Sequence, residues 1–401
     1  MVQHKTSETI NNRYFEGKAL YITTQKQLCE FVEHARTCDL LAVDTEFLRE
    51  KTFWPKLCLM QLATEEQSVV VDPFRVGDLS PLAELFTDES ILKLFHAAGQ
   101  DMEIIHHVLG VVPKPIFDTQ VAASLLGGTL QIGYGALVGN ELGVKLKKAD
   151  SFTDWSRRPL TDSQVEYALD DVIYLPPLYR KMRSRLNKLG RLEWLEKDFE
   201  EISDISRYEV DPYTRYTRLK RVNQLSSRQL SVARLIAAWR ESVAMRRNIP
   251  RKWVMTDEQI VEICKREPRT LDDLFMVRGV AKALKMDEAR RILDMCIKGL
   301  DAPEEEWPHL PKPPKSEPNV DPQVALLYSL VKVRAKENDV AFAVLASHAD
   351  LAKIARGHYE DVDLLRGWRK HLVGDEVIDL VEGRIALTIQ NGQLKVTKTL
   401  Q

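Results

Sequence analysis

The chain has 401 residues, of which 44% are hydrophobic and 29% charged, the composition of an ordinary water-soluble globular protein. Its length exceeds that of one typical hydrophobic core, so two or three domains are expected. The sequence contains no run of about 18 apolar residues, which excludes a transmembrane helix. The first residues do not resemble a secretion signal. The five cysteines are scattered and form no C-x-x-C pair, so neither a disulfide framework nor a zinc site is indicated, and a cytoplasmic protein is expected.

The net charge of −2 is unevenly distributed along the chain. Residues 1–206 contain 23 Lys and Arg against 31 Asp and Glu, a net charge of −8. Residues 207–298 contain 21 against 12, a net charge of +9, and residues 299–401 carry −3. An acidic first half beside a basic middle part suggests a catalytic part next to one that binds a polyanion. The alternative is that the basic helices are merely solvated.

The first half of the chain predicts one mixed sheet with helices packed against it. Apolar runs predict strands at 40–46, 57–63 and 68–72, with a turn at 64–67, and another strand at 91–95 followed by a helix at 101–109. Asp118 is placed to cap a helix at 119–126. Thr161 and Gln164 have the spacing of a capping box that opens a helix at 165–175.

From about residue 219 onwards the pattern indicates helices alone. Residues 301–322 hold seven of the eighteen prolines and read as a stiff polar linker, after which a second helical stretch begins at 323. Residues 271–279 match 359–367 in apolar spacing, and both segments end in Arg-Gly, which suggests a diverged repeat. The expected domains are 1–206, 211–298 and 323–401, with a proline-rich linker at 299–322.

Carboxylates in an apolar setting are the main chemical signal. Asp44 and Glu46 are two residues apart on a predicted buried strand, so both side chains leave the same face. Two uncompensated like charges there are costly, and a divalent cation such as Mg²⁺ or Mn²⁺ removes the problem. The alternative is a surface edge strand with two solvated carboxylates.

Two further patches carry acids. Asp101 begins a predicted helix, where it can also be an ordinary acid stabilised by the helix dipole. Asp171 lies on a helix with Tyr167 one turn before it, whereas the side chain of Asp170 points about 100° away. Each feature alone is common, and the combination is far more specific than its parts.

A D-x-E strand, a second Asp and a later Y-x-x-x-D form the signature of the DEDD exonucleases, in the subgroup that uses tyrosine. The strings Val43-Asp44-Thr45-Glu46-Phe47, Lys148-Ala149-Asp150, Arg158-Pro159-Leu160 and Tyr167-Ala168-Leu169-Asp170-Asp171 resemble ribonuclease D. The two helical stretches resemble the HRDC module shared with RecQ-type helicases. The resemblance implies an α/β ribonuclease H-like exonuclease domain at 1–206, followed by two all-α HRDC-like domains.

The resemblance also implies the chemistry. Asp44, Glu46, Asp101 and Asp171 are expected to hold two divalent metal ions, Mg²⁺ or Mn²⁺. One ion would activate the attacking water and the other would stabilise the departing 3′ oxygen. Tyr167 would orient that water as a protonated phenol. The expected activity is 3′→5′ hydrolysis of RNA to nucleoside 5′-monophosphates, in the maturation of tRNA 3′ ends above all.

Residues for substrate binding are expected around this centre. Phe47 can pack against the terminal nucleotide or belong to the core, and Lys148 falls where the family has a lysine near that nucleotide. In the basic middle part, Arg246 and Arg247 belong to a cluster of basic and aromatic side chains that suits a phosphate backbone. The expected partner is RNA with a 3′ end, bound by a monomer without a membrane. The rival hypotheses are a DNA exonuclease of the Werner type and a non-catalytic scaffold that binds nucleic acid.

Overall fold

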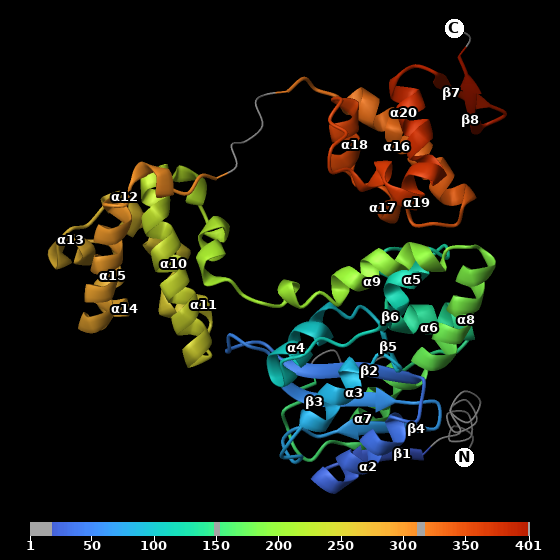
Figure 1. Ribbon diagram of the computed structural model, residues 1–401, viewed down its shortest axis with the longest axis horizontal. Coiled ribbons are helices and arrows are strands. Elements are labelled where there is room, and N and C mark those ends of the chain that lie inside the picture. The colour runs from blue at the N-terminus through green and yellow to red at the C-terminus, as the bar shows by residue number, and fades with distance from the viewer. Residues whose placement is uncertain (1–17, 148–152, 311–316, 400–401) are drawn as a thin grey trace. The chain divides into compact units, whose positions relative to one another are not determined.

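Two compact units make up the computed structural model, which describes residues 18–147, 153–310 and 317–399 (Figure 1). The first unit comprises the described residues of Met1–Glu46, Leu57–Ile205 and Ser316–Gln401. The second comprises those of Phe47–Lys56 and Ser206–Lys315. The C-terminal part of the chain therefore packs with the first half of the sequence and not with the middle.

A six-stranded mixed sheet forms the centre of the first unit, in the order β1-β4-β3-β2-β5-β6. Strand β1 is parallel to β4, and β5 is parallel to both β2 and β6, whereas β3 and β4 are antiparallel. All but the first residue of β3 are buried, as expected for a sheet that helices cover on both faces. The strands are β1 (Lys18–Ile22), β2 (Leu40–Leu48), β3 (Lys56–Ala63), β4 (Gln67–Val71), β5 (Leu92–Phe95) and β6 (Ile116–Asp118).

Helices surround this sheet, and α2, α5 and α7 begin at side-chain caps. Thr24 and Thr161 each form a complete capping box with the glutamine three residues later. Asp118 caps α5 by accepting hydrogen bonds from the backbone N–H groups of Gln120 and Val121. The helices are α2 (Gln25–Ala35), α3 (Ser80–Thr87), α4 (Gly99–Leu109), α5 (Thr119–Ser124), α6 (Tyr134–Leu142), α7 (Asp162–Ile173), α8 (Leu175–Lys188), η1 (Leu192–Leu195) and α9 (Glu196–Ile202).

The second unit is helical and is built around the 21-residue helix α10. Helix α15 crosses α10 closely at Gly299, where a Cβ atom would lie 2.8 Å from the Cα atom of Val232. The connection between β2 and β3 also packs in this unit, because the Asn248 side chain accepts hydrogen bonds from the backbone N–H groups of Phe53 and Trp54. Its main helices are α10 (Ser227–Arg247), α11 (Arg251–Val254), α12 (Asp257–Arg266), α13 (Leu271–Phe275), α14 (Val280–Ala283) and α15 (Met286–Leu300).

The C-terminal part of the first unit is a helical module that ends in a two-stranded hairpin. The hairpin corrects the expectation of an all-α segment at 323–401. Alternating apolar residues form the strands, and Asn391 and Gly392 both have positive φ, as a tight hairpin turn requires. The elements are α16 (Asp321–Glu337), α17 (Phe342–Leu345), α18 (His348–Ala355), α19 (Gly367–Arg369), α20 (Asp375–Val381), β7 (Ile385–Gln390) and β8 (Gln393–Lys398).

This C-terminal module shares a hydrophobic core with the exonuclease part. The rings of Trp194 and Trp368 stack in parallel, with centroids 4.2 Å apart. The buried guanidinium of Arg191 donates hydrogen bonds to the carbonyl oxygens of Leu125 and Asn338, at 2.8 and 2.6 Å. Both aromatic stacking and a buried cation with backbone partners therefore join the two parts.

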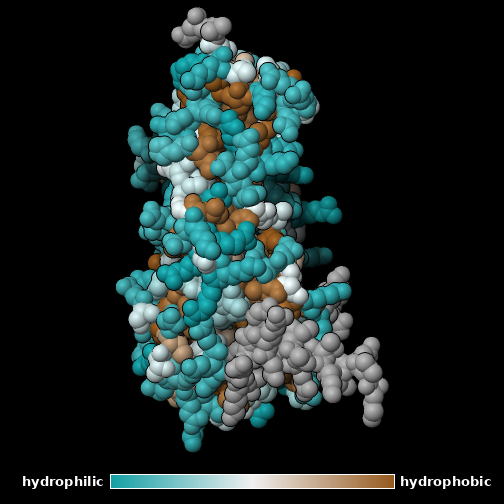
Figure 2. All heavy atoms as spheres, turned by 90° about the vertical axis from the view of Figure 1, so that its right-hand side faces the viewer, coloured by the Kyte–Doolittle hydropathy of each residue, from teal (hydrophilic) through white to brown (hydrophobic). Residues whose placement is uncertain are grey.

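The surface in Figure 2 is largely hydrophilic, and its hydrophobic side chains form small separate areas. Within the described residues, the helices are too short or too polar to span a bilayer.

Candidate active site

Strand β2 carries the first two acids into the site. Residues 40–43 are buried and apolar, which holds this strand in the middle of the sheet. Asp44 and Glu46 follow on alternate positions, so the pleat points both side chains to the same face. Carboxylate oxygens of Asp44, Glu46 and Asp171 all lie within 4.8 Å of one another. The structure thus brings together residues that are more than a hundred positions apart in the chain.

Helix α7 brings the third acid together with a phenol. Tyr167 and Asp171 are one helical turn apart, and the Tyr167 hydroxyl forms a hydrogen bond with the Asp171 carboxylate. The indole of Trp155 stacks on the Tyr167 ring, with centroids 6.0 Å apart, and is itself buried. Trp155 is therefore a packing residue.

Asp101 lies beside these three carboxylates without belonging to their 4.8 Å set. It sits in the first turn of α4, is buried, and accepts a hydrogen bond from the hydroxyl of Thr45. Its negative charge nevertheless acts on the group, because it raises the pKa of Asp44, Glu46 and Asp171. The fourth acid of the predicted set is thus an electrostatic neighbour of the other three.

The electrostatics of the cluster favour a cation. Burial is the largest cause that raises the pKa of each of these carboxyl groups, and neighbouring carboxylates add to it. The pKa rises to about 8 for Glu46 and to about 7 for both Asp101 and Asp171. Hard oxygen ligands in this density suit a divalent cation, which would offset the repulsion. The donor set therefore fits divalent metal binding.

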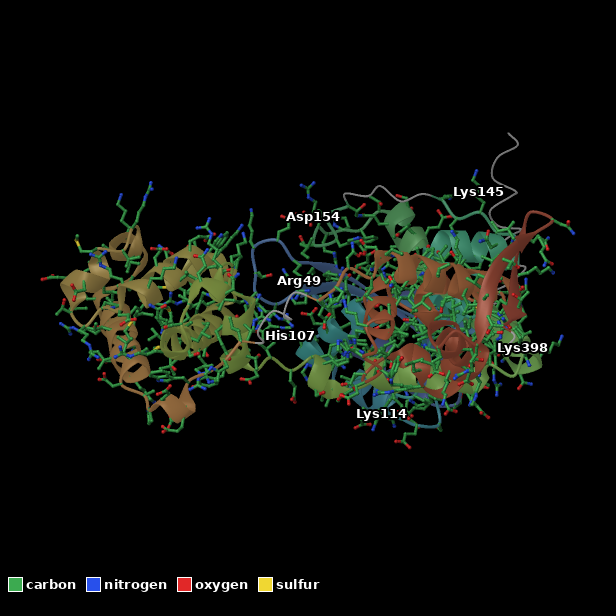
Figure 3. All side chains as sticks on the ribbon, turned by 90° about the horizontal axis from the view of Figure 1, so that it is seen from above. Arg49, His107, Lys114, Lys145, Asp154 and Lys398 are labelled. Atoms are coloured by element: carbon green, nitrogen blue, oxygen red, sulfur yellow. The ribbon has the colours of Figure 1, made fainter. Side chains whose placement is uncertain are left out.

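A cavity of about 550 Å³ adjoins the cluster and shares Tyr167 and Asp171 with it. Helix α6 and the segment after it form the other wall, where the small residues Gly135, Ala136 and Gly139 leave room. Lys145, which follows α6, is exposed and lies on the same edge of the first unit as Asp154 (Figure 3). The mixture of apolar wall, carboxylates and lysines suits a nucleotide.

Known proteins with this combination of site and fold are nucleases. Residues 20–187 match the family described as 3′-5′ exonuclease, and residues 229–296 match the HRDC domain. Ribonuclease D of Sphingobium indicum is 41% identical over 385 residues, covering 94% of this chain and 98% of that protein. Ribonuclease D of Gluconacetobacter diazotrophicus is 39% identical, covering 93% and 95%. The chain belongs to the ribonuclease D family.

A solved structure supports the same assignment. The crystal structure of Escherichia coli RNase D, described as an exoribonuclease involved in structured RNA processing, matches with a TM-score of 0.75 and 29% identity. The match covers 91% of this chain and 99% of that one. As a member of the ribonuclease D family, the chain is a 3′→5′ exoribonuclease, and its acidic cluster is suited to divalent metal ions.

The residues predicted for substrate binding have mixed surroundings in this ribonuclease D fold. Phe47 is half-buried near the end of β2, and Lys148 lies outside the described residues. Arg246 is exposed at the end of α10, whereas Arg247 forms an ion pair with Glu288. Of these two arginines, Arg247 is thus held by an ion pair, and Arg246 is exposed among the side chains that the structure describes.

The neighbouring basic and aromatic residues of the ribonuclease D chain divide into two groups. Arg240 is buried in an ion pair with Asp257, and Arg251 pairs with the fully buried Glu241. Lys252 and Trp253 are exposed on α11. The basic and aromatic side chains of this cluster are therefore of two kinds: some form buried ion pairs and others are exposed at the surface.

Sequence reasoning missed two residues that shape the site. Thr45 lies between the two acids of β2, and the D-x-E pattern attracts attention only to its neighbours. Tyr134 lines the cavity, donates a hydrogen bond to the backbone carbonyl of Asp170 and packs near His96, with ring centroids 5.4 Å apart. A short-range pattern contains no signal for such contacts, because both depend on how elements that are distant in the sequence meet.

Proposed function

We propose that the chain removes nucleoside 5′-monophosphates one at a time from the 3′ ends of structured RNA, with tRNA precursors as the main substrate class. It would act as a cytoplasmic monomer. The convergence of Asp44, Glu46 and Asp171 carries this proposal, because three carboxylates within 4.8 Å repel one another when they are ionised, and a divalent cation offsets that repulsion.

Two divalent ions, Mg²⁺ or Mn²⁺, would be held by Asp44, Glu46, Asp171 and the adjacent Asp101. When bound, such ions polarise the scissile phosphate and lower the pKa of water. The protein positions the phosphodiester in the cavity beside α7, where the exposed Lys145 offers positive charge and Lys147 forms an ion pair with Glu166. Burial and adjacent carboxylates raise the pKa of Tyr167 above its ordinary value, so its hydroxyl stays protonated and orients water instead of removing a proton.

The helical domains would hold the body of the RNA. The first, near residues 211–298, carries the positive charge of the chain and exposes Arg246, Lys252 and Trp253. Basic and aromatic groups of this kind bind a phosphate backbone without sequence preference. The second, near residues 323–401, shares the Arg-Gly motif, and both glycines have positive φ: Gly279 directly precedes the short helix α14, and Gly367 is the first residue of the short helix α19.

Replacing one ligand tests the site. Asp44→Asn should lower the rate of mononucleotide release by about 10³-fold or more, because one charged ligand of the centre is lost. RNA affinity, measured by fluorescence anisotropy, should stay within about threefold of the wild type, since phosphate contacts elsewhere dominate it. Asp162→Asn on the exposed first turn of α7 is the matched control and should retain activity.

Equal activity of Asp44→Asn and the wild type would contradict the metal site.

Matched RNA and DNA substrates with identical 3′ overhangs test the substrate class, and faster digestion of the DNA would favour the Werner-type exonuclease.

A further inference from the structure

Residues 153–161 connect to the start of α7, and Arg158 ties this segment to the sheet. Trp155 in this segment is 8% exposed and stacks on the Tyr167 ring at an interplanar angle of 29°. Three residues later, the side chain of Arg158 leaves the segment and reaches the strands. The position of the indole therefore depends on what holds Arg158.

Arg158 uses all five of its N–H donors. Nε and Nη2 each donate one hydrogen bond to a carboxylate oxygen of Asp72, at 2.6 and 2.9 Å. The other Nη2 hydrogen bond goes to the Cys58 carbonyl oxygen on β3, at 2.8 Å. Nη1 donates to the carbonyl oxygens of Trp155 and Arg157, both at 2.8 Å. Only a guanidinium has this number and arrangement of donors.

Asp72 is equally constrained on its side of the ion pair. Its side chain is fully buried directly after β4, and it also accepts hydrogen bonds from the Tyr21 hydroxyl and the Phe74 backbone N–H. The ring of Phe74 lies under the guanidinium, 4.7 Å from its carbon to the ring centroid. Strands β1 and β3 and the end of β4 therefore converge on a single arginine of the loop.

We propose that the Asp72–Arg158 ion pair positions Tyr167 for catalysis. The pair fixes the Trp155 backbone through the Nη1 hydrogen bond, and the Trp155 indole then limits where the Tyr167 ring can lie. Arg158 is thus a positioning residue that acts through Trp155. This inference rests on the catalytic role proposed for Tyr167.

A purely structural role makes a different prediction. Buried ion pairs contribute little net stability compared with well-packed apolar groups, but they specify one geometry. A structural pair would change the melting temperature and leave kcat unchanged wherever the protein is folded. A positioning pair changes kcat in the folded protein, because misplacement of a catalytic group by about 1 Å costs up to a hundredfold.

The experiment compares Arg158→Lys with Arg157→Lys in the full chain. Lysine keeps the charge at 158 but cannot make the paired hydrogen bonds to Asp72. We expect Arg158→Lys to lower kcat on a 3′-overhang RNA by about tenfold to a hundredfold with KM within about twofold. Arg157 has an 83% exposed side chain that pairs with Asp154 at the surface, so Arg157→Lys should match the wild type. Wild-type kcat in Arg158→Lys would overturn the proposal.

A double-variant cycle tests the path through Trp155. Trp155→Leu alone should lower kcat as Arg158→Lys does, and the double variant should be no slower than the slower single variant, since both act on one geometry. Losses that multiply would show independent effects and would also overturn the proposal. Trp155→Phe, which keeps an aromatic face, should recover most of the activity lost in Trp155→Leu.

Two further variants keep the outcomes distinct. If Arg158→Lys melts below the assay temperature, Tyr21→Phe removes one hydrogen-bond donor to the Asp72 carboxylate without changing the charge, and an unchanged kcat there would contradict the proposal. Tyr167→Phe tests the underlying function separately. Wild-type activity in Tyr167→Phe would refute the role of the phenol, whereas its loss together with normal Arg158→Lys activity would refute the positioning pair alone.

Discussion

At the scale of single residues, alternation along β2 decides which side chains reach the acidic cluster. Asp44 and Glu46 leave one face of the strand, while Thr45 between them donates its hydroxyl to Asp101. A three-residue stretch thereby contributes two carboxylates and orients a third. Hydrogen bonds to metal-binding carboxylates of this kind tune metal affinity.

Substitution of Thr45 should therefore weaken metal binding without removing any carboxylate. Thr45→Val removes the hydroxyl at nearly constant volume, so the Mg²⁺ concentration needed for half-maximal rate should rise by about tenfold to a hundredfold. Thr45→Ser keeps the donor and is the matched control. An unchanged Mg²⁺ requirement in Thr45→Val would show that Asp101 is oriented by other contacts.

The raised pKa values of the cluster predict how stability depends on pH without metal. Glu46, with a folded pKa of about 8, and Asp171, with about 7, keep protons that the unfolded chain releases near its ordinary pKa of about 4. The folded state thus binds more protons in this window, so the stability of the metal-free protein falls as pH rises from about 4 to about 8.

The measurement is the melting temperature in a chelator across that pH range. Added Mg²⁺ or Mn²⁺ should raise it most at the alkaline end, where the carboxylates are ionised. Asp44→Asn should flatten the pH dependence, because it removes one of the interacting charges. A melting temperature that rises between about pH 5 and 8 in the chelator would contradict this reasoning.

At the scale of secondary-structure elements, the crossing of α10 and α15 depends on one glycine. A Cβ atom on Gly299 would lie 2.8 Å from both the Cα and the backbone nitrogen of Val232, and backbone atoms cannot move aside as a flexible side chain can. Gly299→Ala should destabilise the second unit by about 1–3 kcal/mol. Calorimetry on the full chain would measure this shift, with Lys298→Ala on the exposed side of α15 as the control.

Elements with strong local signals were predictable, and those that depend on distant contacts were not. The apolar runs of β2 to β5 and the capping box of α7 are visible in the sequence, and the structure confirms them. Strand β1 was not predicted, because its parallel partner β4 lies far along the chain and no local turn links the two strands. The hairpin β7–β8 was missed although Asn391-Gly392 is a recognised turn signal.

The candidate site shows the same division. A two-residue period places Asp44 beside Glu46, and a one-turn helical spacing places Tyr167 beside Asp171. The resemblance to the DEDD exonucleases joined these two pairs into one predicted site. Asp101 lies outside the group of three carboxylates that are within 4.8 Å of one another. Its position depends on how α4 packs against β2, which no local sequence pattern reveals. In the basic middle part, sequence could not separate Arg240, which is buried with Asp257, from surface arginines of identical type.

At the scale of the whole molecule, the C-terminal module belongs to the first unit through a shared interface. The stacked Trp194 and Trp368 rings are its most specific contact. A double-mutant cycle with Trp194→Leu and Trp368→Leu should give a coupling free energy of about 1 kcal/mol beyond the burial lost. Thermal or urea unfolding of the four proteins measures it, and additive losses would mean that the stack contributes only buried area.

The ten residues between Glu46 and Leu57 have a practical consequence for anyone who divides this chain. Phe53 is 6% exposed, and its ring faces the guanidinium of Arg251, which lies 4.4 Å from the ring centroid. A shortened protein that ends near residue 205 would lack Arg251 and the helices of the second unit, so the side chains of Phe53 and Trp54 would be exposed to water. Both residues lie in the connection that follows the strand carrying Asp44. Poor solubility or low activity of such a fragment would therefore reflect the cut and not the catalytic chemistry.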